Sequence, residues 1–315
     1  MPRPFASSAD VTDKQAVLEE AAEGVYSLTA EGDPNVSAIV GPDSVLCVDA
    51  RATPAHASEW LERLRQLTDR PVEWLLLTHY HAVRVLGASA FCARHVVAHE
   101  NTSRWIHDRG AADWESEYRR FPRLFKDAES IPGLTYPDLT FADRLTLFLG
   151  GREVQILHLG GGHTIGDAVV WLPAERVLLA GDLVEAQAAP YMGDASIREW
   201  TTETLPRIEA LEPRVLVPGR GPVVRGEDVR VCLAEMRAYT GTLWDTVRAC
   251  RERGAPVRQA FGEARAALEP RFSDWAIFEH CLPFNVARAW DEAAGLPPQV
   301  WTTEKDAEVW AELQS

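Results

Sequence analysis

The sequence predicts an α/β protein, an αββα sandwich with a helical C-terminal extension. Strand-length apolar runs fall into two blocks, at residues 24–98 and 145–217, and helical patterns interleave with both. From residue 226 onward the pattern is helical. Two strand blocks covered by interleaved helices favour two packed sheets between helical layers.

The first strand block contains a hairpin, a capped helix and a buried strand. Residues 36–40 and 45–48 are β-rich runs separated by a Gly-Pro-Asp turn, which predicts a hairpin. Thr53 and Pro54 precede an apolar stripe at helical spacing, so we expect a helix whose N-cap is Thr53. The apolar run at residues 72–77 predicts a strand, and strand ends are where loops carry chemistry.

A helical insert and the second strand block follow. Residues 101–137 carry a helical, aromatic pattern without a clear strand, so we expect an insert that roofs a pocket. Strands of the second block are expected at residues 145–149, 154–156, 168–172, 177–180 and 214–217. We expect residues 1–225 to form the sandwich domain and residues 226–315 to form a helical segment packed on it. In that segment, a helix at residues 274–294 should break at Pro283.

The composition indicates a globular protein that acts on a small molecule. The chain has 315 residues, of which 46% are hydrophobic, enough for a large core. Its net charge of -15 argues against a nucleic-acid partner, because nucleic-acid binding depends on clustered Lys and Arg. The start lacks the apolar core of an export signal and no stretch is apolar enough to span a membrane, so we expect a cytoplasmic protein without a membrane partner. The aromatic insert or the C-terminal helices could supply the interface of a homo-oligomer.

Four candidate metal ligands follow predicted strand ends. His79 and His81 are separated by one residue directly after the strand at residues 72–77, so both imidazoles can face the same point. His163 lies in a glycine-rich turn, and Asp182 follows a glycine at the end of a further strand. A lone His-x-His pair is more often structural. Four such residues at strand ends, however, predict a metal site, because imidazole and carboxylate groups are the usual ligands of catalytic zinc.

The order of these motifs resembles that of the metallo-β-lactamase superfamily. The resemblance covers about the first 225 residues, through Asn35, Asp49, Thr78 to Gly87, Gly162 to Asp167, Gly181-Asp182 and Pro218 to Val223. It implies an αββα metallo-β-lactamase sandwich. By resemblance, His79, His81 and His163 would bind the first metal, and Asp182 would be the carboxylate that normally bridges two metals.

The ligands of a second metal are missing from this pattern. The usual His-x-His-x-Asp-His signature reads His79-Tyr80-His81-Ala82-Val83-Arg84, so Val83 and Arg84 replace an aspartate and a histidine. The late Pro-Gly-His-Gly-Pro element carries Arg220 in place of its histidine. Valine has no donor lone pair and arginine stays protonated, so neither can bind a metal cation. The sequence therefore predicts a mononuclear site.

Arg84 and Arg220 together could replace the charge of the lost metal. Two guanidinium groups carry the same formal charge as one divalent ion, so we expect them to pair with Asp182. They would leave a planar fork for a substrate anion or a developing oxyanion, which makes both arginines candidates for substrate binding and catalysis. Two alternatives stay open. The arginines could form only a buried ion pair with Asp182, or their charge could weaken metal binding and leave a pocket without catalysis.

Several other polar residues have weaker signals. Tyr191 and Asp194 lie in the loop after Asp182 and resemble substrate-loop residues of some family members, so Tyr191 is a candidate substrate-binding residue. His280 and Asn285 belong to a predicted helix, where we expect a packing role.

These features predict a metal-dependent hydrolase. One zinc on three histidines brings the pKa of its bound water near 7, and the resulting hydroxide would cleave an ester, thioester or lactone-type bond in a small substrate. Penicillin-type activity is the least favoured option, because no export signal is found. A first alternative is a mononuclear non-haem iron oxygenase acting on a small thiol, since histidines with one carboxylate also suit iron(II). A second alternative is a metal-free binding or vestigial protein.

Overall fold

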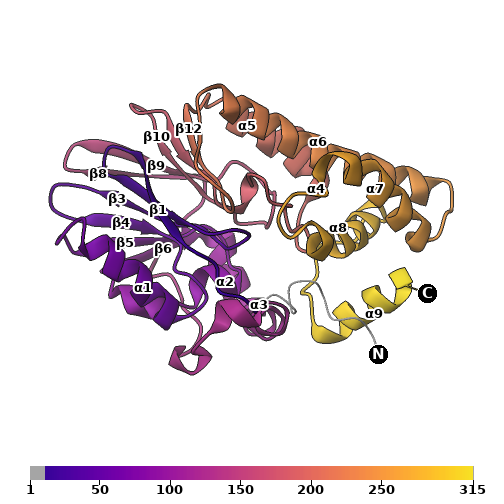
Figure 1. Ribbon diagram of the computed structural model, residues 1–315, viewed down its shortest axis with the longest axis horizontal. Coiled ribbons are helices and arrows are strands. Elements are labelled where there is room, and N and C mark those ends of the chain that lie inside the picture. The colour runs from indigo at the N-terminus through magenta and orange to yellow at the C-terminus, as the bar shows by residue number, and fades with distance from the viewer. Residues whose placement is uncertain (1–10, 315) are drawn as a thin grey trace.

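Two packed β-sheets form the centre of the computed structural model, which describes residues 11–314 (Figure 1). The strands of the first sheet lie side by side in chain order: β1 (Val17–Ala22), β2 (Val25–Thr29), β3 (Val36–Val40), β4 (Val45–Val48), β5 (Val72–Leu77), β6 (His95–His99) and β7 (Leu139–Phe141). They are antiparallel from β1 to β4 and parallel from β4 to β7. The carboxyl ends of the parallel strands therefore meet at one edge of this sheet.

The second sheet has the order β13-β12-β11-β10-β9-β8. Its strands are β8 (Arg144–Leu149), β9 (Arg152–Leu157), β10 (Val169–Leu172), β11 (Val177–Leu179), β12 (Val215–Val217) and β13 (Val224–Arg225). Neighbouring strands are antiparallel except for the parallel pair β11 and β12. The crossover between that pair contains the short helices α4 (Ile197–Glu199) and α5 (Leu205–Glu209), which a π-helical turn, η6 (Trp200–Thr204), connects.

Three apolar clusters define the layers of the sandwich. One cluster lies between the sheets and joins Ile39 of the first sheet to Val154 of the second. Another packs Trp60 of α1 (Pro54–Arg65) onto the outer face of the first sheet. The third joins the outer face of the second sheet to α5 and to the long helix α6 (Glu227–Glu252). The layers run helix, sheet, sheet, helix, which confirms the αββα sandwich that the sequence predicts.

The remaining helices lie in the insert and in the C-terminal extension. The first group contains α2 (Ala82–Val85), η2 (Ala88–Phe91), α3 (Glu100–Arg120), η3 (Pro122–Phe125) and η4 (Ala128–Ser130). The second group continues from α6 with α7 (Val257–Phe272), α8 (Phe278–Ala293) and α9 (Thr303–Gln314). Figure 1 shows α9, in yellow, apart from the sandwich and on the side of α3. In the part of the chain that the structure describes, no helix has the length and apolar character of a membrane span.

Several local expectations differ from the structure, and the short strands β7 and β13 lie outside the expected strand ranges. Strand β1 was not expected, because this edge strand exposes Val17 and contains two consecutive glutamates that obscure any alternation. The expected break at Pro283 was wrong, since this proline lies inside α8. The ring removes one backbone hydrogen bond, but Leu282 and Phe284 on either side are each 1% exposed, and their burial outweighs that loss.

The predicted cap of α1 is confirmed: Thr53 Oγ1 accepts a hydrogen bond from the main-chain nitrogen of His56 at 3.2 Å. Replacing Thr53 with alanine removes this acceptor and should lower the free energy of unfolding by about 1 kcal/mol. Ser58→Ala is the matched control, because its exposed hydroxyl only donates to the Pro54 carbonyl within the same helix. Urea unfolding measures both variants, and a parental midpoint for Thr53→Ala would contradict a stabilising role of the cap.

Candidate metal centre

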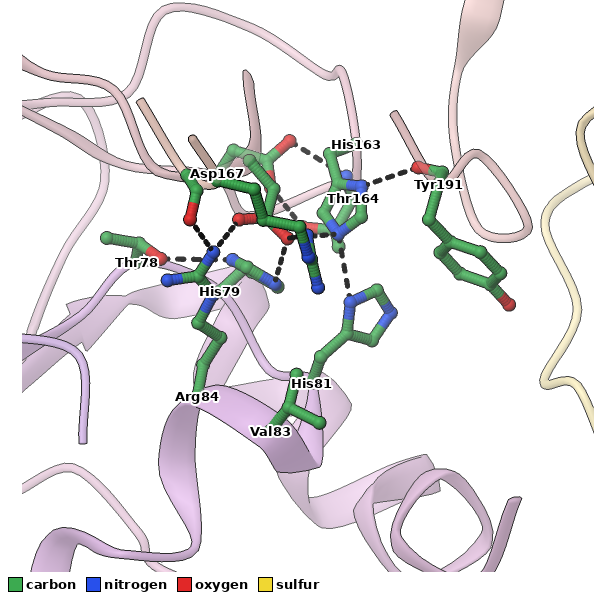
Figure 2. Close-up of polar contacts among 12 residues, drawn as sticks. Thr78, His79, His81, Val83, Arg84, His163, Thr164, Asp167 and Tyr191 are labelled. Carbon is green, nitrogen blue, oxygen red and sulfur yellow. Dashed lines mark hydrogen bonds and ion pairs between the residues drawn. The ribbon is translucent and has the colours of Figure 1, made fainter. Parts of the chain in front are cut away.

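Side chains from both sheets meet at one edge of the sandwich (Figure 2). The β5–α2 connection, α2, the β9–β10 loop, the 3-10 turn η5 (Gly181–Leu183) and the β12–β13 loop supply them. They are His79, His81, Arg84, His163, Asp182 and Arg220, and each is at most 5% exposed. The fold thus brings together the four predicted metal ligands and both predicted arginines.

Three imidazole nitrogens face a common point. One ligand nitrogen from each of His79, His81 and His163 lies within 4.8 Å of the other two. His163 Nε2 and His81 Nδ1 are 2.9 Å apart. Asp182 Oδ2 lies 3.7 Å from His79 Nε2 and 3.6 Å from His163 Nε2. The three nitrogens form a compact donor set, and Asp182 Oδ2 lies beside two of them.

The outer nitrogen of each ring has an acceptor that fixes its tautomer. His163 Nδ1 is 2.7 Å from the Tyr191 carbonyl oxygen, which can only accept, so this nitrogen carries the hydrogen. His81 Nε2 likewise donates to Asp194 Oδ2 at 2.9 Å. The inner nitrogens of both rings consequently present lone pairs toward the common point, as metal-binding histidines do.

His79 follows the same rule through a hydroxyl group. The Thr78 hydroxyl donates to Asp49 Oδ2 at 2.9 Å, so its oxygen is free to accept from His79 Nδ1 at 3.0 Å. Within residues 11–314, the buried Nε2 of His79 has no hydrogen-bond partner. An orphaned, buried lone pair beside two others is costly unless a cation binds there.

The donor set fits one divalent metal ion. Ligand atoms around a tetrahedral zinc with Zn–N bonds of ~2.0–2.1 Å lie roughly 3.3 Å apart, close to the spacing of Asp182 Oδ2 from the two histidines. Burial holds the pKa of His79 well below its ordinary value, and burial with the His81 charge lowers that of His163 to about 3. Both rings are therefore neutral and can donate lone pairs.

Electrostatics differ at His81, which faces a group of carboxylates on its outer side. Burial lowers the pKa of His81, but Asp113, Asp194 and Glu117 outweigh it and raise the value to about 9. In the absence of metal, a proton on His81 would thus occupy the short contact to His163. A metal ion replaces that proton when it binds, as deprotonated ligands require.

Arg84 is bound to protein acceptors through both terminal nitrogens. Nη2 donates to Asp182 Oδ1 and, at 2.7 Å, to the Gly219 carbonyl. Nη1 donates to the Asn35 carbonyl at 2.5 Å and faces Asp49 Oδ2 at 3.3 Å. These four contacts use the terminal N–H groups of Arg84, so they leave no planar fork for a substrate.

Arg220 has fewer partners. Its Nη1 donates to Asp182 Oδ2 at 2.7 Å and to Glu185 Oε1 at 2.9 Å. No acceptor in the described part of the chain faces its Nε. Burial raises the pKa of Glu185 to about 8, although Arg220 opposes that rise. Sequence reasoning missed Glu185, which lies three residues after Asp182 and carries no family signature.

Together the arginines keep the central carboxylate ionised. Burial alone would raise the pKa of Asp182, but Arg84 and Arg220 hold it well below its usual value. Val83, at the position of a second-metal aspartate, is buried in the apolar cluster of the first sheet. The described residues at the second-metal position are thus two guanidinium groups and one aliphatic side chain.

Tyr191 contacts the site through its main chain and through its ring, whose centroid lies 5.7 Å from that of His81 and 6.1 Å from that of His163. Its carbonyl holds His163, as Figure 2 shows, while its buried ring packs on Phe284 of α8 at 5.3 Å between centroids. Asn285 braces the same loop by accepting from Met192 N at 2.8 Å and donating to the Pro190 carbonyl at 2.8 Å. The C-terminal helix α8 therefore supports a loop of the metal centre.

The αββα sandwich and the three-histidine site at its edge define a class of metal-binding hydrolase folds. The family model of the metallo-beta-lactamase superfamily matches residues 29–220, more than half of the chain. This protein belongs to that superfamily, which confirms the resemblance drawn from the sequence motifs.

Three relatives illustrate the similarity. A type 2 metallo-beta-lactamase from Bacteroides fragilis is 39% identical over 100 residues, covering 30% of this chain and 40% of the relative. A solved metallo-beta-lactamase from Pontibacter korlensis aligns with a TM-score of 0.57 at 21% identity, over 72% of this chain and 99% of its own. A stereoselective inverting sec-alkylsulfatase from Pseudomonas sp. aligns with a TM-score of 0.66 at 16% identity, over 88% of this chain and 50% of its own. The chain spans between 40% and 63% of the length of the curated relatives it matches.

The contacts of Arg84 predict a large effect on stability. Arg84→Met keeps the length of the side chain but leaves Asp49 without its buried ion-pair partner and Asp182 with Arg220 alone, so the free energy of unfolding should fall by roughly 3–5 kcal/mol at neutral pH. The Asp182 pKa is depressed in the folded parent, so this stabilisation is present above the unfolded-state pKa and is lost as the pH falls below about 4. The gap between parent and variant should shrink accordingly.

Arg152→Met is the control for this experiment, because it breaks a partly exposed ion pair with Glu175 away from the site. Its effect should stay within about 1 kcal/mol. Denaturant unfolding at pH 7 and at about pH 3, below the unfolded-state pKa of an aspartate, measures both variants. An Arg84→Met loss as small as that of the control would contradict the assigned role.

Proposed function

We propose that this protein is a mononuclear metal-dependent hydrolase that cleaves an ester, thioester or lactone-type bond in a small anionic substrate. One zinc ion is the proposed cofactor, bound by the three histidines and Asp182. The observation that carries the proposal is the convergence of three imidazole lone pairs beside a carboxylate whose other side is occupied by Arg84 and Arg220. That arrangement supplies ligands for one metal and positive charge where a second would lie.

The residues of the chain have separate roles in this proposal. When bound, zinc supplies Lewis acidity and a hydroxide nucleophile at neutral pH. His79 and His163 present neutral lone pairs, His81 releases its proton when the metal binds, and Asp182 offers an ionised oxygen that both arginines hold in place. Because the whole set is buried, each charge acts more strongly than at the surface.

Arg220 is the proposed contact for the substrate anion. Arg84 uses its terminal N–H groups on protein acceptors and therefore acts as a positioning residue for Asp182. Arg220 donates to protein acceptors through Nη1, whereas Arg84 uses both of its terminal nitrogens. A guanidinium anchored at one nitrogen can orient a carboxylate, a sulfate or a developing oxyanion through the others.

The substrate class is the part of this proposal that a panel of compounds must resolve. The acidic chain favours a small molecule over a nucleic acid. Carboxylic esters, thioesters and lactones with a carboxylate form the core of the panel. An alkyl sulfate and a β-lactam belong in it as well, because two of the relatives are named for those activities.

Metal analysis tests the mononuclear site. The purified protein should contain one zinc per chain, and His163→Ala should lose it, because the variant removes one of three converging lone pairs. Removal of zinc with a chelator should abolish hydrolysis, and addition of zinc should restore it. Two metals per chain would contradict the mononuclear site, iron with oxygen uptake would favour an oxygenase, and no metal would favour a binding protein.

Arg220→Ala tests the anion contact. A hydrogen bond to a charged group contributes about 1.5–3 kcal/mol, so kcat/KM for an anionic ester should fall roughly 10- to 100-fold. A neutral ester of the same leaving group should be affected much less, and the zinc content should stay at one per chain. The Arg152→Ala variant, altered at a distant ion pair, is the matched control. Parental kcat/KM on the anionic ester with parental zinc content would refute the role of Arg220.

A further inference from the structure

Three buried carboxylates lie on the outer side of His81, away from the other metal ligands. They are Asp113 and Glu117 of α3 and Asp194 of the loop after β11, and none is more than 4% exposed. Ligand atoms of Asp113 and Asp194 lie within 4.8 Å of one of His81, and Glu117 contacts the main chain two residues after His81. The roles assigned so far to the metal centre use none of these carboxylates as a ligand.

Asp194 is held in one orientation from several sides. Its Oδ2 accepts from His81 Nε2 at 2.9 Å and from the Tyr80 hydroxyl at 2.5 Å. Its Oδ1 faces Arg109 Nη1 at 3.6 Å, and the Arg109 guanidinium stacks on the Trp105 ring at 3.7 Å. The carboxylate therefore has little freedom to rotate, and neither does the imidazole that donates to it.

The two carboxylates of α3 bind the main chain next to His81. Asp113 Oδ2 accepts from Ala82 N at 2.7 Å, and Glu117 Oε2 accepts from Val83 N at 2.8 Å. Because Asp113 and Glu117 are four residues apart, they project from the same face of α3. They satisfy N–H groups in the first turn of α2, which would otherwise have no partner within that helix. Helix α3 thus anchors the segment that carries both His81 and Arg84.

We propose that Asp194 is a positioning residue that orients His81 Nδ1 toward the metal. Asp113 and Glu117 hold the main chain of the residues that directly follow His81. The proposal rests on the metal site of the proposed function, and it gives the helical insert a role in metal binding. The geometry of His81 explains why such support is needed. Its ligand atom is Nδ1, next to the main chain, so both the backbone position and the ring angle decide where the lone pair points.

Loss of the Asp194 charge should weaken metal binding. Without it, His81 Nε2–H would lose a charged acceptor, and the imidazole would become less basic and less well oriented. Removal of such partners of metal-bound histidines typically reduces metal affinity 10- to 100-fold. The alternative occupant of this cluster is a second cation, since ligand atoms of His81, Asp113 and Asp194 also lie within 4.8 Å of one another. The ion pair with Arg109 and the donation from His81 favour the positioning role.

The experiment measures zinc affinity by competition with a chromophoric chelator, which requires no substrate. Asp194→Asn keeps the size of the side chain and removes its charge, and it should weaken zinc binding roughly 10- to 100-fold. The absorption spectrum of the cobalt(II)-loaded variant should change as well, because the orientation of one ligand changes. Asp33→Asn is the matched control: Asp33 is 4% exposed and paired with Arg123 outside the metal centre, so its affinity should equal the parental value.

Two variants of Asp113 in α3 distinguish its hydrogen bond to the main chain of α2 from its negative charge. Asp113→Ala removes the acceptor of Ala82 N and should weaken zinc binding, whereas Asp113→Asn keeps a carbonyl oxygen that can accept and should restore most of the affinity. Thermal unfolding of the metal-free proteins checks that each variant folds. If Asp194→Asn does not fold, Tyr80→Phe replaces it, since it frees Asp194 from one restraint and should weaken zinc binding several-fold.

Three outcomes of these measurements would contradict the positioning role of Asp194. Parental affinity and a parental cobalt spectrum for Asp194→Asn, or parental affinity for Tyr80→Phe where it stands in, would overturn the inference and leave the proposed function intact. A second metal equivalent that disappears in Asp113→Asn would also overturn it, in favour of a cation site. A parental protein that binds no metal would overturn this inference and the proposed function together.

Discussion

The ionised carboxylate of Asp182 is the constraint on which the metal centre depends. It is buried, so its charge is stable only because Arg84 and Arg220 face it. Arg84 lies in α2, which follows β5 of the first sheet, and Asp182 lies in η5, which follows β11 of the second; the same guanidinium binds the carbonyls of Asn35 and Gly219. One charge pair therefore joins the two halves of the sandwich at the edge where the histidines meet.

Two guanidinium groups in place of a second metal give the site a permanent positive charge. An arginine cannot dissociate or lose its proton at physiological pH, so the positive charge beside Asp182 is independent of metal supply. Asp182 also shares the Arg220 guanidinium with a second acceptor, because the same Nη1 donates to Glu185. The proposed zinc would therefore meet a carboxylate that is already oriented and partly neutralised, in contrast to a carboxylate that bridges two metals.

Local sequence patterns were sufficient for the architecture of the chain. The strand runs, the Thr53 cap and the two strand blocks all appear as expected, because each depends on neighbours within a few residues. Expectations differed from the structure where packing dominates. Pro283 continues a helix because its flanking residues are buried by distant segments, and β1 is a strand because it pairs with β2 although its own pattern is irregular.

The sequence by itself determined which donors are present: three histidines and one aspartate at strand ends, with arginines and a valine where second-metal ligands would lie. Only the tertiary structure decided which nitrogen of each histidine faces inward, that Arg84 uses both terminal nitrogens on protein acceptors while Arg220 uses Nη1, and that Asp194 and α3 support His81. The physical reason is distance along the chain. Partners such as His81 and Asp194 are 113 positions apart, so no local pattern encodes their contact. Folding alone brings them within hydrogen-bonding distance.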